Sequence, residues 1–280
     1  MDISTLPKQT QPEMQRVAAK GRIAVRRAAG RSRVARLFQE GAAKIRMPAV
    51  TADALEAVLI NTAGGLTGGD RLAWQVEIED GAAASITTQA CEKVYRAAED
   101  HAEIRCSLRV GRDGYLAWLP QETIVYRRGA LSRRLEVDLE AGARLLMVEA
   151  TVFGRTAMGE TVDRGTFRDR WRIRREGRLF HAEDFSVGPD IAAALGRSAT
   201  AAGATAMATV LLVDGEPERH VEAAREIIGD RGGVSAWTVG GNGKLLARLV
   251  ADDGYGLRKR LMPLLGLLNG KAGLPKTWSL

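Results

Sequence analysis

The sequence predicts a mainly β protein: a wrapped or helical β-sheet body of many short strands, with two α-helical segments near the C-terminus. The first observation is alternation at period two, as in residues 71–79, where Leu72, Trp74, Val76 and Ile78 fall on one side. The second is the recurrence of glycine-containing turns between such stretches. The expected strands are residues 22–27, 54–61, 71–79, 83–90, 101–110, 114–119, 123–127, 134–140, 143–150, 166–175, 178–184 and 205–213.

The last part of the chain mixes helix and strand patterns. Pro217 begins a helical run over residues 218–228. Residues 234–239 and 244–250 are expected to form a hairpin around an Asn-Gly turn. A final helix is expected to carry one apolar stripe, and Pro263 is expected to kink or split this helix. The stripe consists of Leu257, Leu261, Leu264, Leu265 and Leu268.

The chain length suits one large domain, which we expect over residues 16–280 after a disordered lead at residues 1–15. Its β body would cover about residues 20–213 and its mixed part about residues 214–280. Residues 190–206 fit either a helix or a loop. The longest uncharged run has sixteen residues, ending before Asp214, and is too short and too polar to span a bilayer. Two cysteines make no disulfide framework, and no apolar signal segment is visible, so a cytoplasmic location is expected.

The net charge of +7 is unevenly distributed, because arginines gather in two clusters. The first cluster, from Arg16 to Arg36, contains no acidic residue. In the second cluster, alternation places four arginines on one face of a strand and Trp171 and Ile173 on the other; the four are Arg168, Arg170, Arg172 and Arg174. Such a face is either solvated or meets an acidic partner. Aromatic residues are only 5% of the chain and do not alternate with the basic residues, so an acidic protein fits better than nucleic acid.

A glycine-rich loop, Gly64-Gly65-Leu66-Thr67-Gly68-Gly69-Asp70, invites comparison with phosphate-binding loops. A phosphate cradle requires a helix directly after the loop, whereas here a strand pattern follows at residue 71. Asp70 also places a negative charge where phosphate would lie. We therefore interpret the glycines as a turn between strands that needs positive φ or close backbone approach.

Four separated motifs carry a family resemblance. They are Asn61-x-x-Gly64-Gly65-Leu66-x-Gly68-Gly69-Asp70, then Thr87-Thr88-Gln89 with Lys93-Val94-Tyr95-Arg96, then Trp118-Leu119-Pro120-Gln121-Glu122, and Gly154-Arg155-x-Ala157-x-Gly159-Glu160. Together and in this order they resemble the urease accessory protein family called UreD, or UreH in some organisms. The resemblance covers about residues 20–185. Cys91-Glu92 departs from the small or hydroxyl residues expected there.

Enzymatic and metal-binding motifs are not recognisable. The three histidines show no metal-ligand spacing, and no G-x-S-x-G is present. Acidic residues within apolar strand patterns either pair with Lys93, Arg96, Arg155 or backbone turns, or line a hydrated passage with weak oxygen ligands for transient Ni²⁺. The residues for such a passage are Asp70, Glu122, Glu149, Glu160, His181 and Glu183.

The resemblance implies a urease maturation factor with no catalysis of its own and no permanently bound cofactor. Such proteins bind apo-urease and recruit UreF, and through it the GTPase UreG, which supplies nickel and the energy of GTP hydrolysis. By the same resemblance, UreF is expected on the C-terminal helix and the tail to Trp278. Urease is expected on one of the arginine faces.

Two other functions remain open on sequence grounds. The high pI and the arginine clusters alone would also fit a basic nucleic-acid-binding β protein, which should bind DNA with steep salt dependence. A β-rich hydrolase is the other alternative, because catalytic triads are spatial and not visible in a sequence.

Overall fold

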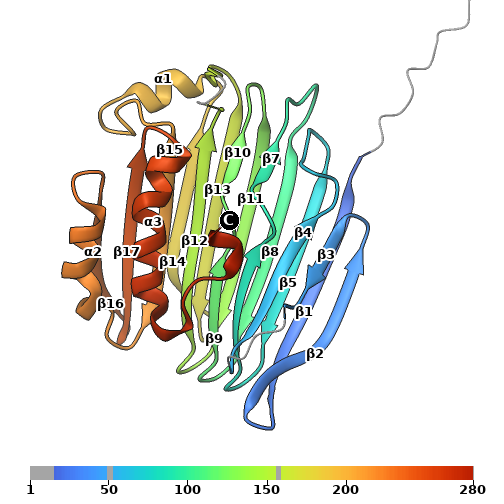
Figure 1. Cartoon of the computed structure of the whole chain (residues 1–280), viewed down its shortest axis with the longest axis vertical. Coiled ribbons are helices and arrows are strands. Elements are labelled where there is room, and N and C mark those ends of the chain that lie inside the picture. The colour runs from blue at the N-terminus through green and yellow to red at the C-terminus, as the bar shows by residue number, and fades with distance from the viewer. Residues whose placement is uncertain (1–15, 49–52, 156–158, 280) are drawn as a thin grey trace, which may run out of the picture.

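A computed structural model of the chain describes residues 16–48, 53–155 and 159–279, and these residues form two stacked β-sheets with helices on one side (Figure 1). The seven-stranded sheet contains, in spatial order, β14 (Arg178–Val187), β13 (Thr166–Arg175), β11 (Ala130–Leu139), β8 (Ala102–Val110), β5 (Arg71–Ile78), β1 (Ala18–Ala28) and β2 (Arg31–Glu40). The main path of the ten-stranded sheet contains, in spatial order, β16 (Gly232–Val239), β17 (Asn242–Ala251), β15 (Ala206–Asp214), β12 (Arg144–Phe153), β9 (Tyr115–Leu119), β6 (Ala83–Thr88), β4 (Leu55–Asn61) and β3 (Ala43–Arg46). Its two remaining strands are β10 (Thr123–Val125), which pairs with β12, and β7 (Glu92–Val94), which pairs with β10.

The body is wrapped because the chain passes back and forth between the two sheets. β5, β8, β11 and β13 are parallel neighbours in one sheet. β4, β6, β9 and β12, which alternate with them along the chain, are parallel neighbours in the other. Successive coils also join at their corners, where the Gly81 amide donates to the Arg112 carbonyl at 2.8 Å. The predicted wrapped β body is therefore confirmed.

Two apolar layers hold the fold together. The inward-facing side chains of both sheets form the first layer, which includes Trp171 and Phe167. The second lies between the ten-stranded sheet and the helices α2 (Val221–Ile228) and α3 (Gly254–Asn269). β12 contributes to both layers, which explains its nearly continuous apolar sequence.

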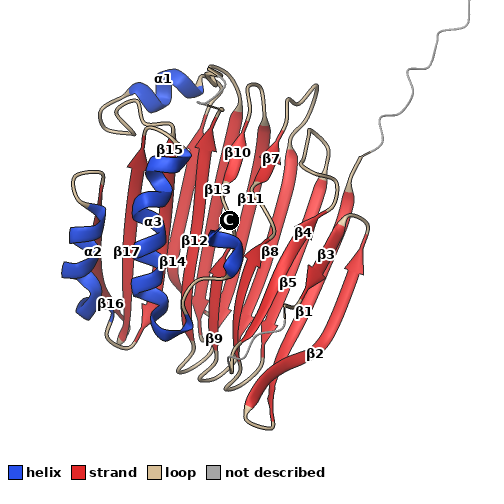
Figure 2. Cartoon of the chain, viewed as in Figure 1, coloured by secondary structure: helices blue, strands red, loops and turns tan. Residues whose placement is uncertain are grey.

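The helices α2 and α3 lie on the ten-stranded sheet, as Figure 2 shows. α1 (Ile191–Gly196) lies at one end of the sandwich, and Asp190 caps it by accepting a hydrogen bond from the Ala193 amide at 3.0 Å. Within the described residues, no helix packs on the outer face of the seven-stranded sheet. No helix of the described part is long and apolar enough to cross a membrane.

Several local predictions are corrected by the structure. The strands β2, β3 and β7 were not expected. Charged side chains interrupt the apolar alternation in β2, and β3 and β7 are too short to show one. The helical run after Pro217 begins as a 3₁₀ turn, η2 (Pro217–His220), and becomes α-helical only at Val221. Two further 3₁₀ turns, η3 (Gly270–Ala272) and η4 (Lys276–Ser279), follow α3.

Pro263 was expected to kink or split the last helix, and it does not split it, because α3 continues from Gly254 to Asn269. Both Pro263 and Lys259, whose carbonyl would receive the missing hydrogen bond, are exposed on α3. Water can therefore satisfy that carbonyl while the buried leucines hold the helix to the sheet. The expected disordered lead at residues 1–15 lies outside the described residues.

Candidate functional site

The glycine-rich loop is a tight connection between β4 and β5, and no helix follows it. Gly64, Gly65 and Gly69 have φ values of 77°, 152° and 86°, which favour glycine. A Cβ on Gly65 would lie 2.4 Å from the Tyr95 ring. Asp70 closes the loop, because its carboxylate accepts from the Thr67 amide at 2.7 Å and from the Val17 amide at 2.8 Å. The turn prediction is confirmed. The Asp70 carboxylate stabilises the loop by binding backbone amides.

Three of the four sequence motifs meet beside this loop. The Thr67 hydroxyl donates to the Arg96 carbonyl at 2.8 Å, which joins the first motif to the second. Tyr95 packs against Tyr126 in a tilted arrangement, with ring centroids 5.2 Å apart. The Arg155 guanidinium lies 4.8 Å from the centroid of the Tyr126 ring and pairs with Glu160 at 2.7 Å. Residues more than sixty positions apart thus form one exposed aromatic and basic surface.

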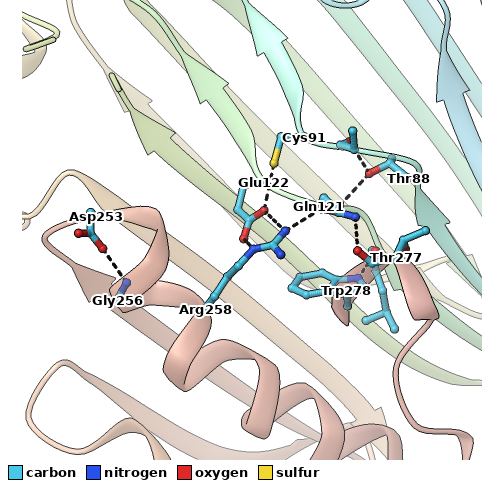
Figure 3. A network of polar contacts seen from close by, with 11 residues as sticks. Thr88, Cys91, Gln121, Glu122, Asp253, Gly256, Arg258, Thr277 and Trp278 are labelled. Carbon is cyan, nitrogen blue, oxygen red and sulfur yellow. Dashed lines mark hydrogen bonds and ion pairs between the residues drawn. The ribbon is translucent and has the colours of Figure 1, made fainter. Parts of the chain in front are cut away.

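The Trp-Leu-Pro-Gln-Glu motif joins the β body to α3, as Figure 3 shows. Arg258 donates to both oxygens of Glu122, at 2.7 and 2.9 Å, and to the Gln121 side-chain oxygen at 2.6 Å. Burial raises the pKa of Glu122, but the hydrogen bonds and charge of Arg258, together with hydrogen bonds from the backbone and Cys91, outweigh burial and leave the pKa below its usual value. The neighbouring Cys91 thiol donates to Glu122. Burial of this thiol, followed by the negative charge of Glu122, raises the pKa of Cys91 to about 11. Cys91 is therefore a protonated thiol at neutral pH and a poor nucleophile.

The C-terminal tail packs into the same network. The Trp278 indole nitrogen donates to the Leu119 carbonyl at 3.0 Å, and its side chain is 1% exposed. The Gln121 side chain donates to the Thr277 carbonyl at 2.7 Å (Figure 3). The tail is consequently a structural part of the body.

A second polar cluster lies between the two sheets. Arg133 on β11 is buried, donates to Asp169 on β13 at 2.6 and 3.0 Å, and forms an ion pair with Glu149 on β12. The Trp118 indole nitrogen also donates to Glu149 at 3.0 Å. Burial raises the pKa of Glu149, partly opposed by Arg133. One cation and two carboxylates thus share a buried site.

This cluster borders a cavity of about 480 Å³ between the sheets. Glu149 and Asp169 line this cavity. Glu183 on β14 and Arg248 on β17 also line it and form an ion pair 2.5 Å apart. The indole N–H of Trp171 also borders the cavity and has no protein acceptor among the described residues. A buried donor of this kind calls for water or another acceptor, which indicates a hydrated cavity.

Comparison with known proteins adds the identity of the family. The family described as UreD urease accessory protein matches residues 17–279. This chain belongs to the UreD family. A protein of Mesorhizobium japonicum named urease accessory protein UreD is 62% identical over 269 residues, which cover 96% of each chain. A Brucella melitensis protein named urease accessory protein UreD 1 is 58% identical over 267 residues, which cover 95% of each chain.

The resemblance predicted from the four motifs is confirmed, and it extends beyond the expected residues 20–185. The relatives are named as accessory proteins, in agreement with the expectation that UreD family members are not enzymes. Within the described residues, the fold supplies no group of three or more histidine, cysteine or acidic side chains close enough to hold a metal ion.

The structure separates most residues of the predicted nickel passage. Asp70 lies in the glycine loop, Glu122 lies under α3, and Glu160 lies on the exposed motif surface. Only Glu149 and Glu183 line one cavity. The alternative that these acids pair with basic residues holds for Glu160 with Arg155, as expected from the sequence.

His181 lies on β14 in a setting unfavourable to a metal cation. Burial, followed by the charges of Lys244 and Arg248, lowers the pKa of His181 to about 4. Its Nε2 atom is buried and has no hydrogen-bond partner among the described residues. A dication at His181 would be repelled by Lys244 and Arg248, whose charges add to burial in keeping the imidazole neutral.

The two proposed partner surfaces differ in accessibility. The expected alternation on β13 is confirmed, with Trp171 and Ile173 buried. The four arginines of the second cluster face outward, and they are Arg168, Arg170, Arg172 and Arg174. The leucine stripe of α3, in contrast, packs entirely into the core under the ten-stranded sheet; its members are Leu257, Leu261, Leu264, Leu265 and Leu268. A partner at α3 would therefore meet its exposed residues.

Sequence reasoning missed Arg133, Asp169 and Arg258, the three charged residues that organise both polar clusters. Asp169 has a visible signal, because alternation on β13 places it on the inward face with Trp171. Arg133 has the same signal on β11. Arg258 has none, because it pairs with Glu122 across 136 positions of sequence.

Proposed function

We propose that this chain is a urease maturation factor that acts as a non-catalytic scaffold. It binds apo-urease and, with UreF and the GTPase UreG, enables GTP-dependent insertion of nickel into the urease active site. The observation that carries this proposal is the match to the UreD urease accessory protein family over residues 17–279. The absence of a built metal centre within the described residues fits a scaffold better than a storage protein.

The hydrated cavity between the sheets supports a further part of the proposal, transient passage of nickel. Glu149 and Glu183 supply oxygen ligands, which hold Ni²⁺ less tightly than imidazole or thiolate. Each of these carboxylates is already paired with an arginine, which weakens its attraction for a passing dication. Such a lining suits an ion that must be released again.

Replacement of Glu149 or Glu183 by glutamine should lower the nickel content of urease by about half or more, because each change removes an anionic ligand from the cavity. The measurement is nickel per urease after co-expression with each variant. Glu160→Gln is the matched control, because Glu160 lies on the motif surface outside this cavity. Normal nickel content with both cavity variants would contradict passage through the cavity. Full loading of urease without the chain would contradict the proposed function itself.

We place the UreF contact on the exposed side of α3 and the urease contact on an arginine face. Removal of α3 would not test the first placement, because the leucine stripe would leave the core and the chain would unfold. The double variant Tyr255→Ala/Lys259→Glu changes only exposed residues of α3.

This double variant should weaken UreF binding roughly tenfold, because Tyr255 is 70% exposed and aromatic anchors dominate many interfaces. A pull-down with purified UreF measures the effect, and Arg197→Glu at the end of α1 serves as a surface control. Full UreF binding by the double variant would refute the placement on α3.

A further inference from the structure

The two arginine clusters of the sequence lie on the same face of the same sheet. The first cluster forms β1 and β2 at one edge of the seven-stranded sheet, and the second forms β13 near the other edge. The strands between them add outward-facing cations of their own; these are Arg105, Arg109 and Arg134. The basic residues thus extend across the whole sheet.

Register places several of these cations side by side. Arg105 on β8 is the direct neighbour of Arg134 on β11, and Arg134 is the direct neighbour of Arg170 on β13. Neighbouring strands are about 4.8 Å apart, so three guanidinium groups follow one another across about 10 Å. Like charges directly opposite each other destabilise a sheet.

Acidic residues relieve this row only at its ends. Arg105 pairs with Glu103 at 2.6 Å, and Arg170 lies 3.6 Å from Asp184. Arg134, at the centre, has no ion pair with any residue that the structure describes. The row therefore retains uncompensated positive charge at its middle.

The face that carries this row is uncovered and has a concave margin. Within the described residues α2 and α3 contact the opposite sheet, α1 lies at one end of the sandwich, and no helix lies over this face. Beside β2 the surface forms an open groove of about 630 Å³, lined by Arg22, Arg36, Phe38 and Glu77 among others. Phe38 is 46% exposed there and contributes apolar surface at the margin.

We propose that this basic face, defined as the outer surface of β1, β2, β5, β8, β11 and β13, docks an acidic protein surface. The row of Arg105, Arg134 and Arg170 forms its electrostatic centre, and the groove at Phe38 forms its margin. The inference rests on the proposed function, within which apo-urease is the partner.

Charge pattern favours a protein over nucleic acid as the occupant. Outward-facing acids are interspersed among the arginines, namely Glu77, Glu103, Glu136, Asp138 and Asp184. A continuous phosphate backbone would be repelled by these carboxylates, whereas a protein surface can match both signs of charge. The central row also lacks aromatic side chains on which bases could stack.

The decisive variant is Arg134→Glu in the full chain. It places a carboxylate between Arg105 and Arg170, so the fold should be unchanged or slightly more stable. Binding to purified apo-urease should nevertheless weaken roughly ten- to hundredfold at low salt, and less at high salt. Arg225→Glu on α2 makes the same charge change away from the basic face and should leave binding unchanged.

A loss of apo-urease binding by Arg134→Glu without a loss of stability would distinguish a docking defect from misfolding. Apo-urease binding by Arg134→Glu equal to that of the unchanged chain would overturn the inference. An equal loss of apo-urease binding with Arg225→Glu would also overturn the inference. So would an Arg134→Glu variant that loses binding to duplex DNA but keeps binding to apo-urease. Urease nickel content with and without the unchanged chain tests the proposed function separately from this result.

Discussion

Replacement of Arg133 by methionine should lower the free energy of unfolding by about 3–5 kcal/mol near pH 7. Arg133 is the only cation that contacts Glu149 and Asp169 in the part of the chain that the structure describes. Methionine preserves much of the apolar contact but leaves two carboxylates buried without a counter-ion. The measurement is urea unfolding of the purified chain followed by intrinsic fluorescence.

The cost of this change should depend on pH in a defined direction. Burial already raises the pKa of Glu149, and loss of its counter-ion Arg133 raises that pKa in the folded chain further above the unfolded value. The folded variant then binds more protons than the unfolded one, so its stability increases as the pH falls. The difference from the unchanged chain should be largest above pH 7 and smaller near pH 5.

Arg134→Met is the matched control, because it is the next residue on the same strand and faces solvent. Its expected effect is within about 0.5 kcal/mol. Equal effects of the two changes would show that Arg133 is not the partner that compensates the buried acids.

This pair of neighbours also shows how far the sequence predicts the structure. Period-two alternation assigns Arg133 inward and Arg134 outward once the strand is recognised, although only residues 134–140 of β11 were expected. Alternation cannot show that Asp169 and Glu149 come from different sheets to meet Arg133. That meeting depends on the wrapped topology, which brings β11, β12 and β13 together.

The missed elements have a related physical cause. On β2, residues such as Arg33, Arg36 and Phe38 are largely exposed, because the strand lies at a sheet edge and buries little of either face. Its pairing with β1 is therefore specified by backbone hydrogen bonds, which leave no hydrophobic period in the sequence. The glycine loop was predictable for the opposite reason, since positive φ strongly selects glycine.

The C-terminal tail gives the second large expected effect, although it follows the last long helix. Trp278→Ala should lower the free energy of unfolding by about 3–5 kcal/mol, because a fully buried indole is removed from the apolar layer beneath α3. The change also leaves the Leu119 carbonyl without the indole donor. Thermal unfolding measures the loss, and Ser279→Ala, at an exposed neighbouring position, should have little effect.

Trp278→Phe separates the two contributions. Phenylalanine retains most of the buried apolar surface but cannot donate to Leu119, so its cost should be only about 1–2 kcal/mol. Equal losses with alanine and phenylalanine would mean that the hydrogen bond, not burial, secures the tail. Because Gln121 donates to Thr277 and also accepts from Arg258, release of the tail should loosen α3 as well. Faster amide exchange in α3 of the alanine variant would show that the tail and the helix are held as one unit.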